Sequence, residues 1–155
     1  MKINNLQKSI NDSSCEHEYI NIIIDNFLDH NKKLLSNNLN EKEKNEYFRN
    51  PVLLTIKILL ERNIIKIHDP KNGEIWSYSP TESINKVKSY WKKDSIFPEF
   101  YNMPSFSWTT EFKNKILNDG YKLNTNWSSY LEKSKYLQEL LYVNKDIFLN
   151  RLKEI

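Results

Sequence analysis

Residues 13–36 carry apolar and polar side chains in the pattern of an amphipathic helix. Ser13, followed three positions later by Glu16, matches a capping box, a common start of a helix. The apolar residues that follow recur on one helix face: Ile20, Ile23, Ile24, Phe27, Leu28, Leu34 and Leu35. We therefore predict a helix that ends near residues 36–38. The polar residues 1–12 before it are expected to be flexible.

Residues 41–62 are predicted to form two helices. The first covers residues 41–49. The second begins at Asn50 and Pro51, because asparagine is a favourable N-cap and proline suits the first helical position. This second helix is apolar on nearly all sides, which is typical of a buried central helix. Asn63 can end it in the left-handed conformation.

Residues 64–78 have the pattern of a β-hairpin. The β-branched segment 64–68 predicts a strand, residues 69–73 are typical of a turn, and residues 74–78 predict the returning strand. The order helix, helix, hairpin over residues 41–78 resembles a winged-helix unit, with the turn as its wing.

The C-terminal half is predicted to be helical, with one ordered loop over residues 94–108, where aromatic residues and two prolines show little periodicity. The expected N-caps of its helices are Ser79 with Glu82, Thr109 or Thr110, Asn126 for one helix through Leu141, and Asn144. The fold class is thus mainly α (α+β): a compact helical domain with one central two-stranded β-hairpin, winged-helix-like in the middle.

The composition of the chain limits the classes of protein to which it can belong. A length of 155 residues fits a single domain, residues 1–155, and the 13% share of aromatic residues indicates a chain that folds. One cysteine excludes a disulfide framework. The N-terminal residues lack the apolar core of an export signal, and no stretch is apolar enough to span a membrane. We expect a cytoplasmic protein that does not enter a membrane.

The sequence offers little for catalysis. With only 2 glycines, a phosphate-binding glycine loop or a nucleophile elbow cannot be built. Cys15 and His17 would point about 200° apart on a helix, so they cannot share a metal ion. His68 beside Asp69 could act as a general base, although the local sequence places no nucleophile near it. We expect no enzyme activity, no catalytic residue, no metal and no cofactor.

Two surfaces are candidates for binding. Aromatic residues dominate the centres of protein interfaces, so a first surface would use the aromatic side chains Trp76, Tyr78, Phe97, Tyr101, Phe106 and Trp108. The formal net charge is +3, and the basic excess lies in residues 51–93. A second, alternative surface for nucleic acid would use the lysines Lys71, Lys86, Lys88, Lys92 and Lys93.

Residues 53–91 are similar to small bacterial immunity proteins of toxin–immunity pairs, of the contact-dependent growth inhibition type. The similarity lies in an aliphatic helix (53–62), a short hairpin (64–78) and a capped helix that ends at Trp91. It implies a protein that binds a cognate toxin in the cytoplasm and blocks it without a cofactor. Immunity proteins against basic nucleases tend to be acidic, whereas this chain is +3.

These observations favour a non-enzymatic protein-binding protein, an immunity or antitoxin-like inhibitor whose partner is a cognate toxin. The alternative is a winged-helix-like nucleic-acid-binding protein that uses the lysine-rich helix face. Neither function involves a membrane.

Overall fold

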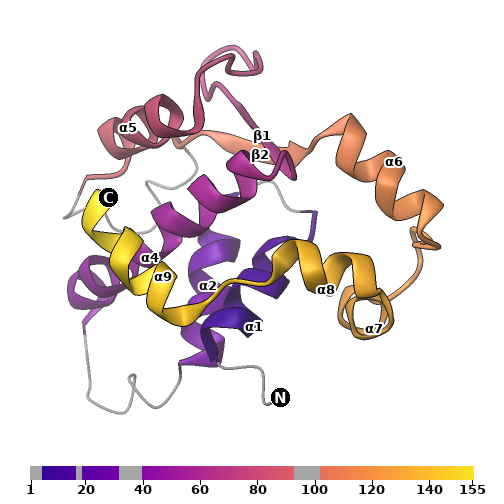
Figure 1. Cartoon of the computed structure of the whole chain (residues 1–155). Coiled ribbons are helices and arrows are strands. Elements are labelled where there is room, and N and C mark those ends of the chain that lie inside the picture. The colour runs from indigo at the N-terminus through magenta and orange to yellow at the C-terminus, as the bar shows by residue number, and fades with distance from the viewer. Residues whose placement is uncertain (1–4, 17–18, 32–39, 93–101) are drawn as a thin grey trace.

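The computed structural model describes residues 5–16, 19–31, 40–92 and 102–155. These residues form a mainly helical fold with one two-stranded antiparallel sheet, which confirms the expected fold class (Figure 1). In chain order the elements are α1 (Asn5–Ser13), α2 (Ile20–His30), α4 (Glu41–Glu61), β1 (Ile65–His68), α5 (Pro80–Tyr90), β2 (Ser105–Trp108), α6 (Thr110–Asn118), α7 (Trp127–Lys133), α8 (Lys135–Leu141), α9 (Lys145–Arg151) and the 3-10 turn η2 (Leu152–Glu154).

Helix α4 is the centre of the fold, as its apolar sequence predicts. Leu53, Ile56 and Leu59 face the main hydrophobic core, while Leu54 and Ile58 face a second, smaller core beneath α1 and α9. Burial on both sides explains why this segment carries apolar residues nearly all round. Asn63, which follows the helix, adopts a positive φ of 55°, as expected of an asparagine that ends a helix.

The prediction of two helices over residues 41–62 is wrong, because α4 is continuous and contains Pro51 in its interior. Its N-cap is Asn40, whose side chain forms a capping box with Glu43, and not Asn50. Proline in a helix interior loses one hydrogen bond, which the burial of the segment 52–59 outweighs. Without a separate first helix, the helix–helix–hairpin order of a winged-helix unit is absent from residues 41–78.

The predicted hairpin is also wrong in its second strand. β1 pairs with β2 in antiparallel register, from Ile65 opposite Trp108 to His68 opposite Ser105, and residues 74–78 contribute only a single bridge, Ile75 to His68. β2 lies inside the segment expected to be a loop. It alternates serine with Phe106 and Trp108, so both aromatic rings lie on the core side of the sheet.

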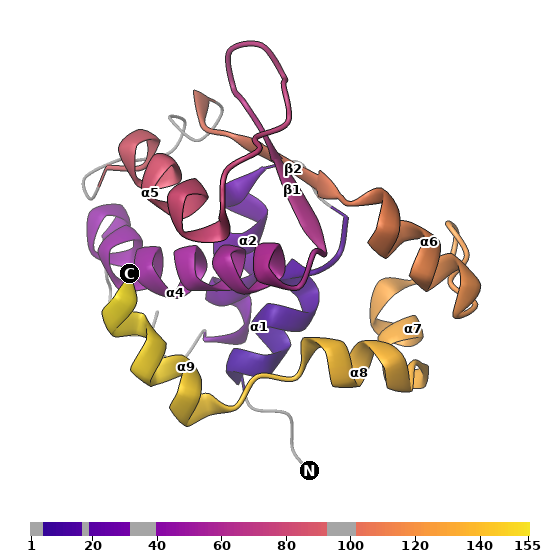
Figure 2. The ribbon, with the colours of Figure 1, turned by 45° about the horizontal axis from the view of Figure 1, so that its top comes forward.

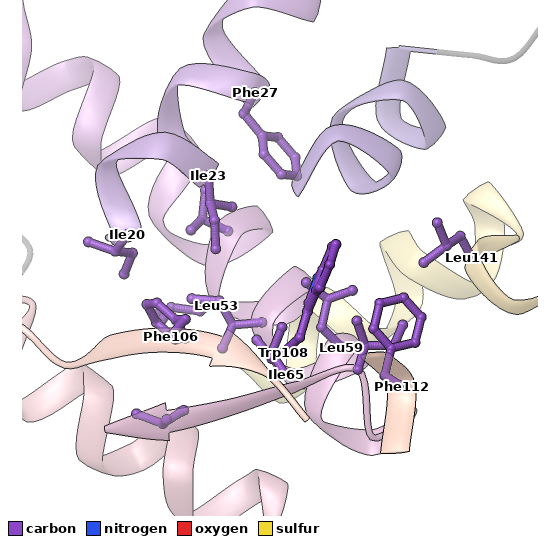
Figure 3. Packing of buried hydrophobic residues seen from close by; sticks show 14 of the residues in the cluster. Ile20, Ile23, Phe27, Leu53, Leu59, Ile65, Phe106, Trp108, Phe112 and Leu141 are labelled. Carbon is purple, nitrogen blue, oxygen red and sulfur yellow. The ribbon is translucent and has the colours of Figure 1, made fainter. Parts of the chain in front are cut away.

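Figure 3 shows how the sheet and the helices share the core. Phe106 and Trp108 lie below Ile20, Ile23 and Phe27 of α2 in this view, and the labelled residues of α4, Leu53 and Leu59, lie beside the two aromatic rings. This arrangement encloses the main hydrophobic cluster, to which α2, α4 and both strands contribute.

The N-terminal segment is a helix over residues 5–13, which contradicts the expected flexibility there. Ile10 is fully buried in the smaller core, and the side chain of Gln7 bonds the backbone of both Leu141 and Val143. Ser13 is the last residue of α1 and does not open the next helix, because α2 begins only at Ile20.

The helices after β1 begin largely where their caps predict. Ser79, Thr109, Asn126 and Asn144 each accept a hydrogen bond from a backbone N–H group in the first turn of their helix. The expected single helix through Leu141 is divided at Ser134, where α7 ends and α8 begins. Among the described residues, no helix combines the length and the apolar character needed to cross a membrane.

Candidate partner-binding site

The chain between β1 and α5, which we call the 69–79 loop, projects beyond the rest of the molecule (Figure 2). Its base is closed by backbone hydrogen bonds from Asp69 N to Glu74 O (2.8 Å), from Gly73 N to Asp69 O (2.9 Å) and from Trp76 N to Ile67 O (2.9 Å). Gly73 has a φ of 73°, which glycine adopts without strain. The turn predicted here is therefore present, although the strand expected after it is not.

Four side chains, which we call the brace, connect this loop to α5: Asp69, Trp76, Tyr78 and Lys86. The indole Nε1 of Trp76 donates to Asp69 Oδ2 at 3.0 Å, and the ammonium of Lys86 lies 3.7 Å from the same oxygen. Lys86 Nζ also donates to the hydroxyl of Tyr78 at 3.0 Å and lies 4.5 Å from the ring centres of both Trp76 and Tyr78. These are cation–π distances, so one lysine binds both aromatic rings and the carboxylate.

The charges in the brace stabilise each other. The pKa of the Asp69 carboxyl is lowered, first by the backbone N–H of Lys71 and then by the Trp76 indole and Lys86. The pKa of Lys86 is raised, chiefly by its hydrogen bond to Tyr78 and also by Asp69. Both groups are therefore held in their charged forms, which keeps the brace intact at neutral pH.

Two apolar side chains of the loop face solvent. Ile75 is 55% exposed and Tyr78 is 48% exposed, on a loop that also carries the exposed charges of Lys71 and Glu74. Beneath them, Trp76 is half-buried and its ring lies 6.4 Å from that of Tyr90 on α5. The result is a projecting segment that combines two exposed apolar side chains, exposed charges beside them and a base closed by hydrogen bonds.

The six aromatic residues that the sequence suggests for partner binding do not lie on one surface. Trp76 and Tyr78 lie together in the 69–79 loop. Phe106 and Trp108 are only 2% and 4% exposed, so assigning them to a partner surface is wrong: the alternation of β2 directs both rings into the core. Phe97 and Tyr101 lie outside the described residues.

The lysine candidates do not assemble on one face. Lys86 and Lys88 are two positions apart on α5, about 200° around a helix axis, and they contact different elements: Lys86 reaches the 69–79 loop, whereas Lys88 donates to the backbone oxygen of Ile155. Burial, Arg49 and Lys57 lower the pKa of Lys88. Lys71 and Lys92 are exposed, and Lys93 lies outside the described residues.

His68, the candidate base, bridges the loop and the sheet. Its Nε2 lies 2.8 Å from the hydroxyl of Ser107 and its Nδ1 lies 3.2 Å from the carbonyl oxygen of Gly73. A serine–histidine contact is one part of a nucleophilic site, but the neighbouring Asp69 carboxylate is turned to Trp76 and Lys86 and does not orient the imidazole. The contact joins β2 to the turn.

The half-buried thiol of Cys15 has a raised pKa, caused first by its burial, which makes it a poor nucleophile. His17, which was considered with it as a metal ligand, lies outside the described residues. Within the described part of the chain, no group of three His, Cys, Asp or Glu side chains is placed to hold a metal ion.

Sequence reasoning missed two residues of this site. Ile75 was assigned to a strand, and Asp69 to a catalytic pair or a turn. The available signal was the segment 69–76 itself, in which an aspartate opens the turn and a tryptophan follows it, close enough for the indole to reach the carboxylate. Comparison of the chain with protein-family models, with curated proteins and with solved structures gave no match.

Proposed function

We propose that this chain is a non-enzymatic protein-binding protein that contacts its partner through the 69–79 loop. The observation that carries the proposal is a projecting loop that exposes Ile75 and Tyr78 while Asp69, Trp76 and Lys86 hold its base. In its more specific form, the proposal is a cytoplasmic immunity or antitoxin-like protein whose partner is a cognate bacterial toxin.

The toxin as partner comes from the resemblance of residues 53–91 to immunity proteins. Of the pattern behind that resemblance, the aliphatic helix, the turn and the capped helix α5 are present, and the second strand of the hairpin is not. Inhibition by such a protein needs only a tight contact that covers the active site or a required surface of the toxin, so no cofactor takes part.

The brace makes the loop suitable for tight binding. Ordering a flexible loop costs free energy on association, and a loop that is already ordered avoids that cost. Tyrosine is favoured in such a position because it offers a large contact surface with few rotatable bonds. Lys71 and Glu74 on the exposed part of the loop provide charges for selecting one partner over another.

The chain offers a closely matched control for a test of this site. Tyr142 is 49% exposed and Ile147 is 58% exposed, nearly the same as Tyr78 and Ile75. Neither lies on the loop, because Tyr142 is the C-cap of α8 and Ile147 lies in the first turn of α9. The pair of double variants Ile75→Asp/Tyr78→Ala and Ile147→Asp/Tyr142→Ala therefore removes the same kinds of side chain from two separate surfaces.

The experiment is a tagged pull-down from the native cell at moderate salt, with mass spectrometry and a 260/280 nm absorbance ratio on the eluate. The unmodified chain and the α9 variant should retain one stoichiometric protein, and the loop variant should lose it. Expression of the retained protein alone should stop growth, and co-expression of the chain should restore it.

Each other result has a definite meaning. Loss of the partner only in the variant Ile147→Asp/Tyr142→Ala would show that the partner does not bind the 69–79 loop. A retained protein that is harmless on its own would contradict the proposal that the partner is a toxin, but it would still support protein binding. An eluate dominated by nucleic acid and released by salt would instead favour the nucleic-acid alternative.

A further inference from the structure

A second site lies away from the 69–79 loop, on the side of the molecule where α6, α7 and α8 lie (Figures 1 and 2). A cavity of about 610 Å³ opens there, within the usual size range of small-molecule sites. Its lining comes from the end of α6, the connection to α7 and the junction of α7 with α8, and the residues that matter here are Asp119, Lys122, Thr125, Ser129, Lys133 and Lys135.

The cavity is basic. Lys122, Lys133 and Lys135 line it against one acidic residue, Asp119, so the lining carries a formal charge of +2. All three lysines are exposed, and none forms a salt bridge with any carboxylate of the described residues. Three lysines that line one hollow are suited to binding an anion with several oxygens, and lysine binds phosphate as a point charge.

One oxygen of the Asp119 carboxylate, which lines the cavity, already accepts hydrogen bonds from the protein. Asp119 Oδ2 accepts hydrogen bonds from the hydroxyl of Tyr130 at 2.8 Å and from the hydroxyl of Ser134. Ser134 in turn accepts from the backbone N–H of Leu137 at the start of α8. This network fixes the base of the cavity, and the hydroxyls of Thr125 and Ser129 on its wall can donate to a ligand.

We propose that this cavity binds a small phosphorylated sugar or mononucleotide. The phosphate would lie among Lys122, Lys133 and Lys135, and the carboxylate of Asp119 with the hydroxyl of Ser129 would bond the sugar hydroxyls. The charges match, because a phosphate monoester carries about −1.5 to −2 at neutral pH and the lining carries +2. The hollow is large enough for a ligand of that size.

Isothermal titration with ribose 5-phosphate and adenosine 5′-monophosphate tests the site, with ribose and inorganic phosphate as comparison ligands. The triple variant Lys122→Ser/Lys133→Ser/Lys135→Ser removes the proposed phosphate contacts. Its control is Lys42→Ser/Lys145→Ser/Lys153→Ser, which removes the same charge from exposed lysines that do not line the cavity.

We expect saturable binding of at least one phosphorylated ligand and none of ribose. The cavity variant should weaken that binding at least about tenfold, since charge-assisted hydrogen bonds to phosphate are stronger than hydrogen bonds between neutral groups. The control should stay within about twofold, because exposed charges far from a ligand are screened. Amide resonances of Gly120, Thr125 and Ser129 should shift on titration, and this readout remains if the triple variant fails to fold.

The proposal is overturned by any of three results. These are no saturable binding of either phosphorylated ligand, an equal loss of binding in both triple variants, and amide shifts confined to residues outside the cavity. Tighter binding of a single-stranded oligonucleotide that is equally weakened in both variants would also overturn it, because it would indicate a diffuse attraction to all lysines.

Discussion

The indole Nε1 of Trp108 donates a hydrogen bond to the carbonyl oxygen of Ser14 at 2.9 Å, across 94 positions of the chain. Trp127 does the same to the carbonyl of Asn11 at 3.0 Å. Asn11 and Ser14 lie at the C-terminal end of α1, so these two indoles connect β2 and α7 to that end of the helix. The N-terminal helix is thereby built into the core.

Replacing Trp108 by phenylalanine should lower the free energy of unfolding by about 2–3 kcal/mol, because it removes buried surface and leaves a buried carbonyl without its donor. Urea unfolding followed by circular dichroism measures the change. Trp76→Phe is the control, since it removes an indole hydrogen bond at the half-buried base of the loop and should cost less. Equal effects of the two variants would mean that the bond to Ser14 adds little.

Local signals in the sequence were enough for the helices after β1. Ser79, Thr109, Asn126 and Asn144 each carry the capping side chain that the first turn of a helix needs, and the contact lies within three residues. The same holds for Gly73 in its turn, where the positive φ is a property of the residue itself. Such features do not depend on the rest of the chain.

The strand that pairs with β1, and the helical state of residues 5–13, depend on contacts between residues that lie far apart in the sequence. Residues 74–78 lie next to β1 along the chain, but Trp76 and Tyr78 pack on Lys86, while Phe106 and Trp108 fill the core side of β2. The alternation of serine and aromatic residues at 105–108 was the available signal for this strand. For α1, the bonds from Trp108 and Trp127 have no counterpart in local pattern. The loop site was found in part, through Trp76 and Tyr78.

Replacing Pro51 or Pro80 by alanine should change the free energy of unfolding in different directions. Pro51 lies inside α4, where it cannot donate to the carbonyl of Tyr47. Pro51→Ala should therefore raise the free energy of unfolding by about 1 kcal/mol, the net contribution of one hydrogen bond. Pro80 occupies the first position of α5, where no donor is needed, so Pro80→Ala should give no gain or a small loss. Thermal or urea unfolding compares them, and a loss of stability in Pro51→Ala would show that its ring packing matters more than the missing bond.

The brace of the 69–79 loop should fail in acid. The lowered pKa of Asp69 means that its stabilising contribution is complete above the ordinary carboxyl value of 3.8 and is lost as the pH falls through the lower folded-state value. The indole N–H resonance of Trp76, assigned with Trp76→Phe, should therefore be constant near pH 5 and move only below about pH 3.8.

Two controls accompany that titration. Asp69→Asn should abolish the movement of the Trp76 resonance, and the Trp108 resonance, whose acceptor is a backbone carbonyl, should show no matching midpoint while the protein stays folded. A midpoint for Trp76 above 3.8 would contradict the proposed charge arrangement around Asp69.

Tyr130 should make the protein less stable in strong alkali. Burial, and then the hydrogen bond to Asp119, raise its pKa to about 12 from an ordinary value of 10.0, so the folded state keeps the phenol protonated where the unfolded state does not. Its stabilising contribution is complete below pH 10 and declines between pH 10 and 12, by about 2–3 kcal/mol in total. Urea unfolding at intervals across that range should show Tyr130→Phe losing less stability with pH than the unmodified chain. Tyr142→Phe controls for removal of a phenol, and parallel pH curves for the unmodified chain and Tyr130→Phe would contradict the assignment.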